Sequence, residues 1–234
     1  MKPGSTIVIV GSRRGLGRSL AQHYAEHGHT VFGLSRGQSK LVHERYQHIC
    51  ADVTAEDTIQ RAFARIANAG SLVDVLIYSA AIASPNYALL TPHTLASQML
   101  STNLLGAFLV TRHAARLMKR NGFGRMIYLS SIVVPLGSPG QVVYSASKAG
   151  LEQMAYTLSR EFPQDNITFN SLGISFYASS MLHGLSERAL SEARALLSKP
   201  NILQLQEIVG AIDFLASDTA RNITGQTLYF GGVR

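Results

Sequence analysis

The chain has 234 residues, of which 46% are hydrophobic and 15% are charged. This balance excludes an intrinsically disordered chain and fits one large domain. A single cysteine, Cys50, excludes an intramolecular disulfide framework and a cysteine-rich zinc site, and the eight scattered histidines form no ligand pattern, so we expect no metal. No stretch reaches the roughly 18 apolar residues of a membrane span, and the first apolar run is too short for a secretion signal. These features predict a soluble, cytoplasmic protein.

The net charge is +7, from 21 basic and 14 acidic residues. Residues 1–45 carry +5 and residues 101–150 carry +6, whereas residues 46–100 and 151–234 are each −2. Such an excess is compatible with nucleic acid, an acidic membrane surface or an anionic small molecule. Because it gathers in two places, we treat each basic cluster separately.

Short apolar runs alternate with longer segments of helical periodicity along the chain. We expect strands at Thr6–Val10, Thr30–Leu34, His48–Ala51, Val73–Ser79, Arg125–Ser130, Thr168–Leu172 and Thr227–Phe230. We expect helices at Leu16–His27, Ala55–Ala69, Leu95–Lys119, Tyr144–Phe162 and Leu205–Leu215. Strand runs without alternation are typical of a parallel sheet covered on both faces. The succession predicts an α/β, Rossmann-type, doubly wound sheet with helices on both faces, in one domain over residues 1–234.

A glycine-rich turn follows the first expected strand and opens the first expected helix. It comprises Gly11, Ser12, Arg13, Arg14, Gly15, Leu16 and Gly17. Glycines let the backbone approach a pyrophosphate, and the N–H groups and dipole of the helix N-terminus favour its charge. The turn therefore predicts a nucleotide site, although its G-x-x-x-G-x-G spacing is a variant and the alternative is an ordinary strand-to-helix turn.

The end of the second expected strand bears on which nucleotide binds. NAD sites usually place Asp or Glu there to accept from the ribose 2′-hydroxyl, but Ser35 and Arg36 stand there and the next acid is Glu44. Arg36 with Arg13 or Arg14 would bind a 2′-phosphate, and Ser35 would add a hydroxyl donor. The pattern favours NADP(H), the alternative being solvated surface arginines.

Asp52 and Val53 follow the third expected strand, on the same side of the sheet. Asp52 either accepts a hydrogen bond from an adenine amino group or serves as the N-cap of the segment that follows. The sequence leaves both readings open.

Tyr144 and Lys148 lie four residues apart at the start of an expected helix, and so share one helix face. A nearby ammonium stabilises phenolate, which would lower the tyrosine pKa and make it a proton donor for carbonyl reduction. Ser131 ends the fifth expected strand, where its hydroxyl can bind a developing alkoxide. Asn103 falls within the long expected helix, where asparagine is neutral to unfavourable, so we expect a buried polar partner, a bound water or simple exposure.

Together these residues resemble the short-chain dehydrogenase/reductase family. The order and spacing match its nucleotide loop and its Asn–Ser–Tyr–Lys tetrad, at Gly11, Gly15, Gly17, Asn103, Ser131, Tyr144 and Lys148. The likeness spans essentially the whole chain, and its length and C-terminal tail look most like the 3-oxoacyl-[acyl-carrier-protein] reductases. It implies a seven-stranded parallel sheet, an NAD(P) cofactor, usually a homotetramer, and NADPH-dependent reduction of a 3-oxoacyl thioester in fatty-acid or polyketide-type biosynthesis.

The resemblance also implies residue roles. Tyr144 would protonate the carbonyl oxygen while Ser131 orients it, Lys148 would hold the nicotinamide ribose, and Asn103 would anchor a proton-relaying water. The cofactor would further be lined by Ala80, Ala81, Gly173 and Ile174.

Several positions depart from the family pattern. Tyr78-Ser79-Ala80-Ala81 replaces the usual Asn-Asn-Ala-Gly, and Leu172-Gly173 replaces Pro-Gly. Tyr177 stands where a threonine usually contacts the carboxamide, with Ser175 or Ser179 as substitutes, and Phe230 replaces an Asp. None belongs to the tetrad, so we expect catalysis to be retained and cofactor affinity or substrate choice to differ, unless the changes are neutral.

Two further segments bear on the substrate. Residues 176–204 interrupt the alternation as an expected helical lid, whose apolar residues either face the substrate or pack on the body: Tyr177, Met181, Leu182 and Leu185. The second basic cluster comprises Arg112, Arg116, Lys119, Arg120 and Arg125. An acidic acyl carrier protein would dock near Arg116, Lys119 and Arg120, unless this is simply a solvated helix face.

Three other functions remain open. The first is an NADP-dependent reductase or dehydrogenase of a free small ketone or alcohol. The second is an NADP-binding sensor or structural protein without turnover, which the altered 78–81 segment keeps in consideration. A nucleic-acid binder rests on the +7 charge alone, and no RNP, zinc-finger or arginine-rich tract supports it.

Overall fold

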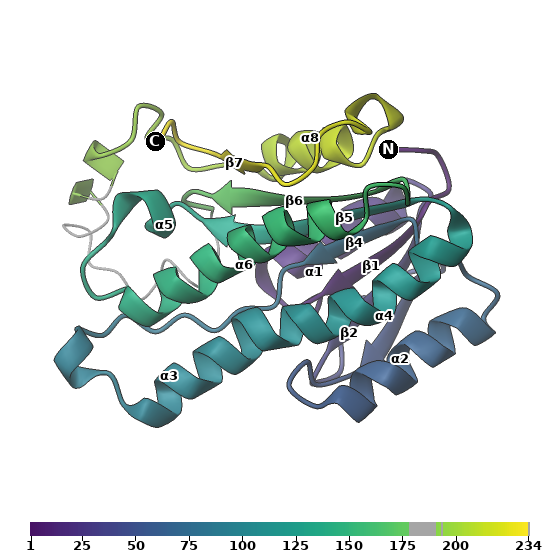
Figure 1. The fold of residues 1–234 in the computed structure, drawn as a ribbon, viewed down its shortest axis with the longest axis horizontal. Coiled ribbons are helices and arrows are strands. Elements are labelled where there is room, and N and C mark those ends of the chain that lie inside the picture. Colours follow the sequence, from purple (N-terminus) through teal and green to yellow (C-terminus); the bar gives the residue numbers. More distant parts are fainter. Residues whose placement is uncertain (178–190, 193, 234) are drawn as a thin grey trace.

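The computed structural model describes residues 1–177, 191–192 and 194–233, built around one sheet of seven parallel strands. The strand order is β3-β2-β1-β4-β5-β6-β7 (Figure 1). It reverses between β1 and β4, and ligands of such sheets bind beyond the carboxyl ends of the strands at this reversal. The predicted seven-stranded, doubly wound fold is confirmed. The strands are β1 Thr6–Val10, β2 Thr30–Ser35, β3 Tyr46–Cys50, β4 Val75–Tyr78, β5 Gly124–Ser131, β6 Ile167–Ile174 and β7 Thr227–Tyr229.

Helices cover both faces of the sheet. Figure 1 shows α2, α4 and α6 side by side on one face. Helices α1 and α8 pack on the other face, through a separate core cluster. The helices of the two layers are α1 Gly15–Glu26, α2 Glu56–Asn68, α3 His93–Leu100, η2 Ser101–Leu105, α4 Gly106–Asn121, α6 Val142–Glu161 and α8 Leu205–Leu215. Short helices occur at η1 Ala88–Leu90, α5 Val133–Leu136 and η4 Asp218–Ala220.

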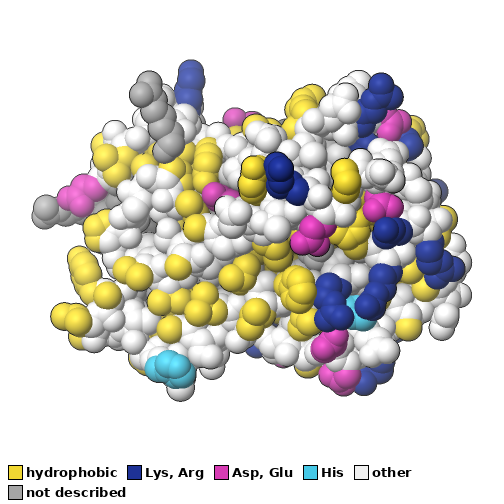
Figure 2. All heavy atoms as spheres, viewed as in Figure 1, with side chains coloured by type: hydrophobic (Ala, Val, Ile, Leu, Met, Phe, Trp, Pro, Cys, Tyr) yellow, Lys and Arg dark blue, Asp and Glu magenta, His cyan; other side chains and the backbone are white. Residues whose placement is uncertain are grey.

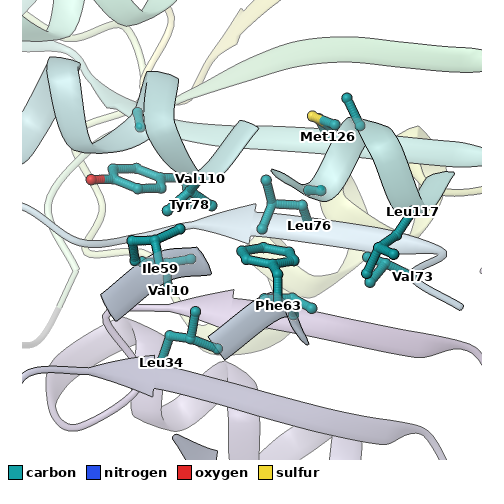
Figure 3. Packing of buried hydrophobic residues seen from close by; sticks show 14 of the residues in the cluster. Val10, Leu34, Ile59, Phe63, Val73, Leu76, Tyr78, Val110, Leu117 and Met126 are labelled. Carbon is teal, nitrogen blue, oxygen red and sulfur yellow. The ribbon is translucent and has the colours of Figure 1, made fainter. Parts of the chain in front are cut away.

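The two core clusters explain why the strands are apolar without alternation. In β1, Val8 and Val10 belong to the cluster beneath α2, α4 and α6, whereas Ile7 and Ile9 belong to the cluster beneath α1 and α8. All four side chains are fully buried. Each such burial stabilises the fold by about 1.5–3 kcal/mol. Figure 3 shows the first cluster, in which residues of β1, β2 and β4 meet residues of α2 and α4.

The prediction of one regular helix at Leu95–Lys119 is wrong in one respect. The observed helix runs from α3 to α4 through a π-helical turn, η2. The turn places one extra residue in the helix at Asn103, and periodicity does not predict such an insertion. The four-residue helix α5 was also not expected, and β3 begins two residues early, at Tyr46, because its half-exposed side chains do not form an apolar run.

No helix in the described ranges is long and apolar enough to cross a membrane. Within the same residues, no group of three or more His, Cys, Asp or Glu side chains is arranged to hold a metal ion.

Candidate active site

The glycine-rich turn closes tightly between β1 and α1. A Cβ on Gly11, whose φ is +88°, would lie 2.7 Å from the backbone nitrogen of Ala80, and a Cβ on Gly17 would lie 2.4 Å from the carbonyl oxygen of Gly11. Helix α1 starts at Gly15, with Arg14 at the N-cap and no side chain capping its N–H groups. These free donors at the end of β1 fit a pyrophosphate.

Two arginines mark the neighbouring corner. The Arg13 guanidinium lies against Gly37, since a Cβ on that glycine would be 2.8 Å from Arg13 Nη1. Arg36 is exposed one residue earlier in the chain. Within the described residues, neither of them nor Arg14 forms an ion pair with Asp or Glu. The corner therefore holds unneutralised cations, which fit a 2′-phosphate.

Behind this corner lies a hydrogen-bonded network that the sequence analysis missed. His48 Nε2 is 2.9 Å from the carbonyl oxygen of Gly37, so this nitrogen carries the proton and Nδ1 accepts from the Tyr46 hydroxyl at 2.9 Å. The buried Ser12 hydroxyl then donates to Tyr46, and Ser35 donates to the Gly37 carbonyl. Both predicted serines thus bond inside the protein. Polar residues at alternate positions of β3 were the signal that could have revealed the network.

The neighbouring adenine-side positions have local roles in the fold. One Asp52 carboxylate oxygen accepts from the backbone and hydroxyl of Thr54, and the N-cap of α2 is Ala55, so Asp52 is not the N-cap. Val53 is buried in the first core cluster. Ala80 lies against the glycine turn, whereas its neighbour Ala81 is partly buried.

Three of the four tetrad residues converge at the carboxyl end of β5. Ser131 ends β5, and its side chain interacts with that of Tyr144 in α6, acting to lower the pKa of the tyrosine. Lys148 lies one helical turn further on, with Nζ 5.7 Å from the centroid of the Tyr144 ring. Its ammonium donates to the Leu129 carbonyl oxygen at 2.6 Å. A proton donor, a hydroxyl partner and a cation therefore share one site.

Burial dominates the ionisation of this group. It raises the pKa of Tyr144 to about 12, although the Ser131 hydrogen bond acts in the opposite direction. Burial lowers the pKa of Lys148 to about 8, although the Glu152 carboxylate opposes this. The expected lowering of the Tyr144 pKa is therefore wrong for the chain as described, because removal from water raises this pKa by more than the opposing interaction with Ser131 lowers it.

Asn103 is fully buried within the π turn. Its amide nitrogen donates to the Ile82 carbonyl oxygen and to Ser147 Oγ, and its amide oxygen accepts from the Ile82 N–H. These bonds link the helix to the segment after β4 and to α6. The buried polar partner is thus found, and both amide hydrogens are already used within the protein.

Tyr78 gives the altered 78–81 segment a role in the fold. Its buried hydroxyl donates to the Thr102 carbonyl oxygen at 2.6 Å, one residue before Asn103. A Cβ on Gly106 would lie 3.0 Å from this hydroxyl and 2.7 Å from Val53 Cγ2, so the glycine makes the contact possible. Figure 3 shows the Tyr78 ring among the core side chains. Tyr78 therefore anchors the helix that carries Asn103.

The end of β6 provides the other predicted contacts. Ser175 is buried, and its hydroxyl has no partner within the described part of the chain, which fits a polar ligand group at this edge. Gly173 makes room for the Tyr229 ring, and its neighbour Ile174 accepts from the Ile132 N–H. Tyr177 pairs with Leu203 and, like Phe230 and Ile174, packs against the second core cluster. Ser179, Met181, Leu182 and Leu185 lie outside the described residues.

Glu152 is a functional candidate that the sequence analysis missed. It lies on α6 one turn beyond Lys148, and its carboxylate accepts from the hydroxyls of Ser130 and Tyr229. An acidic residue four positions after Lys148 was the available signal.

The second basic cluster divides into three environments. Arg112 pairs with Glu56 at 3.2 Å, and Lys119 pairs with Asp165 at 3.1 Å. Arg125 lies in β5, as expected, but it is fully buried and donates to backbone carbonyls, so including it in the basic cluster was wrong. Arg116 and Arg120 line a groove between α4 and α2, together with Gln60, Phe63 and His113.

Fold and site together define an α/β oxidoreductase with a nucleotide cradle and a Ser–Tyr–Lys centre. A family model described as enoyl-(acyl carrier protein) reductase matches residues 10–232. The 3-oxoacyl-[acyl-carrier-protein] reductase MabA of Mycobacterium tuberculosis is 31% identical over 227 residues, covering 97% of this chain and 91% of the relative. FabG of Aquifex aeolicus, also a 3-oxoacyl-[acyl-carrier-protein] reductase, is 30% identical over 239 residues, covering 98% and 96%.

A solved structure described as a gluconate dehydrogenase from Agrobacterium tumefaciens has a TM-score of 0.90 at 26% identity, covering 98% of this chain and 95% of that one. The chain belongs to the short-chain dehydrogenase/reductase family, and it is an oxidoreductase that uses a nicotinamide cofactor.

Proposed function

We propose that the chain is an NADPH-dependent carbonyl reductase that reduces a 3-oxoacyl thioester, carried on an acyl carrier protein, to the 3-hydroxyacyl product. The observation that carries the proposal is the juxtaposition of Ser131 and Tyr144 at the carboxyl end of β5, with Lys148 one turn further along α6. The 3-oxoacyl reductases among the relatives support the substrate class. Fatty-acid or polyketide-type biosynthesis would use such a product.

The residues divide the chemistry between them. Ser131 and Tyr144 hydrogen-bond the substrate carbonyl oxygen, which orients and polarises it. Tyr144, protonated at neutral pH, transfers its proton to the oxygen as negative charge develops there. Lys148 would hold the nicotinamide ribose through its ammonium. The cofactor, when bound, supplies the hydride. Asn103 connects the helix that contains it to the backbone of Ile82, and so holds the segment after β4 in place around these groups.

Charge at the 35–37 corner supports NADPH as the preferred cofactor. Arg13 and Arg36 would bind the 2′-phosphate, Gly11 and the N–H groups at the start of α1 would face the pyrophosphate, and Ser175 would bond the carboxamide. Without a carboxylate at the end of β2, the ribose hydroxyls of NADH lose their usual acceptor.

A carrier protein would dock on α4. Arg116 and Arg120 lie four residues apart, so their like charges repel unless an anionic partner neutralises them. Figure 2 shows Lys and Arg side chains gathered over the α2 and α4 side of this face. Lys119 contributes less to this surface, because Asp165 already neutralises it.

A second copy of the chain would cover the apolar side of α3, α4 and α6. Leu105, Phe108 and Val142 are 58%, 45% and 57% exposed, and Figure 2 shows hydrophobic side chains spread over this region. Phe214 in α8 and Leu228 in the edge strand β7 are also exposed and offer a second surface. Two such surfaces support a homotetramer, which sedimentation velocity would distinguish from a dimer.

The test is a substrate panel followed by NADPH absorbance. A 3-oxoacyl thioester on an acyl carrier protein should turn over faster than the same acyl group on a short thiol, and Arg116→Glu should reduce only the first rate. An enoyl thioester and gluconate with NADP+ represent the reactions named for the matching family model and the structural neighbour. Faster turnover of either would overturn the substrate assignment, and NADPH binding without hydride transfer to any ketone would indicate a non-catalytic protein.

A further inference from the structure

Glu152 lies on the same face of α6 as the reacting groups. Tyr144, Lys148 and Glu152 are spaced four residues apart, so they follow one another along a single helix face. The Glu152 carboxylate reaches two strands, because one oxygen accepts from Ser130 Oγ in β5 and the other accepts from the Tyr229 hydroxyl in β7 at 2.5 Å. Both partners donate, which suits an ionised carboxylate.

The position of Tyr229 depends on a glycine in the neighbouring strand. Gly173 in β6 pairs in register with Tyr229, and a Cβ on Gly173 would lie 2.0 Å from the tyrosine ring. The ring can therefore cross β6 only because no side chain is present there. Burial and the adjacent carboxylate raise the pKa of Tyr229, so its hydroxyl remains a donor to Glu152 at neutral pH.

Three consecutive residues at the end of β5 connect this arrangement to the active site. The Leu129 carbonyl accepts from Lys148, Ser130 Oγ donates to Glu152, and the side chain of Ser131 interacts with that of Tyr144. Any shift of Ser130 relative to α6 would thus move the acceptor that holds the Lys148 ammonium.

The environment of Lys148 leaves its charge dependent on Glu152. Lys148 is 2% exposed, and burial favours loss of its proton. The titratable groups recorded beside it are Tyr144 and Glu152 on α6, and Tyr229 on β7 lies beyond Glu152; both tyrosines are neutral at pH 7. Glu152 is the group that opposes burial.

We propose that Glu152 is a positioning residue that keeps Lys148 charged and fixes the end of β5 against α6 and β7. Its importance for turnover rests on the proposed function, because Lys148 must be an ammonium to hold the nicotinamide ribose. Its effect on Lys148 does not depend on any substrate.

The direct test is an NMR titration of the substrate-free protein with 13C-labelled lysine side chains. The chain has five lysines, so the spectrum contains few signals. The Lys148 signal is the one that is missing from the spectrum of the Lys148→Arg variant. The wild-type midpoint should lie near pH 8. Glu152→Gln keeps the size and one acceptor oxygen, and its NH2 can donate to the hydroxyl that loses its acceptor. The change removes the charge, and it should lower the midpoint by roughly one pH unit. An unchanged midpoint would overturn the proposal.

Two variants separate charge from hydrogen bonding. Tyr229→Phe removes one donor but keeps the Glu152 charge, so the Lys148 midpoint should not fall. Glu161→Gln, on the exposed end of the same helix, is the matched control and should match the wild type. If Glu152→Gln does not fold, Glu152→Met removes the same charge with an apolar side chain of similar length. The Lys148 midpoint of this variant should also fall by roughly one pH unit.

The kinetic readout is the pH dependence of kcat/KM for ketone reduction. In Glu152→Gln the alkaline limb should move to lower pH by the shift seen in the titration, with kcat/KM at pH 6 within about twofold of the wild type. An equal loss at every pH would indicate a merely structural role and contradict the proposal. If the wild type reduces no ketone, the proposed function fails, and the NMR titration still decides the role of Glu152.

Discussion

At the residue scale, burial moves Tyr144 and Lys148 toward their neutral forms. A pKa near 12 keeps the tyrosine protonated at neutral pH, which suits it to donate a proton. The reverse reaction, alcohol oxidation, needs the phenolate as a base and is disfavoured at the same pH. The proposed reduction should therefore proceed more readily than oxidation at neutral pH, and its rate should fall as pH rises through the Lys148 pKa of about 8.

Replacing the proton donor tests this assignment. Tyr144→Phe removes only the hydroxyl, so kcat for ketone reduction should fall by at least about 100-fold, while the NADPH Kd stays within a few-fold of the wild type. Stopped-flow absorbance and NADPH fluorescence measure the two quantities. Tyr156→Phe, on the same helix with a half-exposed ring, is the control and should retain full activity. A Tyr144→Phe enzyme with near-normal kcat would require another acid.

At the element scale, the π turn is the feature that most affects the site. It places Asn103 against the Ile82 backbone and Ser147. Tyr78 holds the turn from β4. Catalytic sites often contain such turns, because the extra residue redirects a side chain that a regular helix would point elsewhere.

Tyr78→Phe tests the anchor. The change leaves the Thr102 carbonyl without its hydroxyl partner in a buried place, so the free energy of unfolding should fall by about 1 kcal/mol or slightly more. Urea unfolding followed by circular dichroism measures the loss. Tyr87→Phe, at a ring that is 67% exposed, should leave stability unchanged. Equal stability of the two variants would show that the Tyr78 hydroxyl does not hold the helix.

Much of this architecture was predictable from sequence, for identifiable reasons. An uninterrupted apolar run such as Ile7–Val10 is typical of a strand in a parallel sheet that is covered on both faces. The positions of Ser131, Tyr144 and Lys148 in the expected elements predict that the first ends a strand and that the other two share one face of a helix. The π turn was not predictable, because a single inserted residue does not produce a recognisable change in the hydrophobic periodicity of the helix. Neither was the Glu152–Tyr229 contact, because it joins residues 77 positions apart through the space left by Gly173.

At the scale of the whole molecule, several tyrosines are buried in the two cores. Burial raises the pKa of Tyr24, Tyr78 and Tyr128 above the ordinary value near 10. Above pH 10 the unfolded chain therefore releases tyrosine protons that the folded chain retains, so the free energy of unfolding falls as pH rises. Lys148 has the opposite effect: folding lowers its pKa to about 8, so between about pH 8 and 10.5 this one group raises the free energy of unfolding as pH rises.

The expected result is alkaline unfolding that begins above about pH 10. Thermal melts followed by circular dichroism at pH 8, 9, 10 and 11 measure it, and the change in Tm should concentrate between the last two. A Tm that is unchanged at pH 11 would mean that the tyrosines titrate in the folded protein and are less buried than described.

The central claim is that this chain binds NADPH at the corner formed by Arg13 and Arg36 in order to reduce a carbonyl. Titration of the wild type and of Arg36→Asp with NADPH and NADH, followed by cofactor fluorescence, tests it most directly. Loss of charge-assisted bonds to the 2′-phosphate should raise the NADPH Kd roughly 10- to 100-fold, without weakening NADH. Arg65→Asp, an exposed charge reversal on α2, should change neither value. An unaltered preference for NADPH in Arg36→Asp would contradict the account.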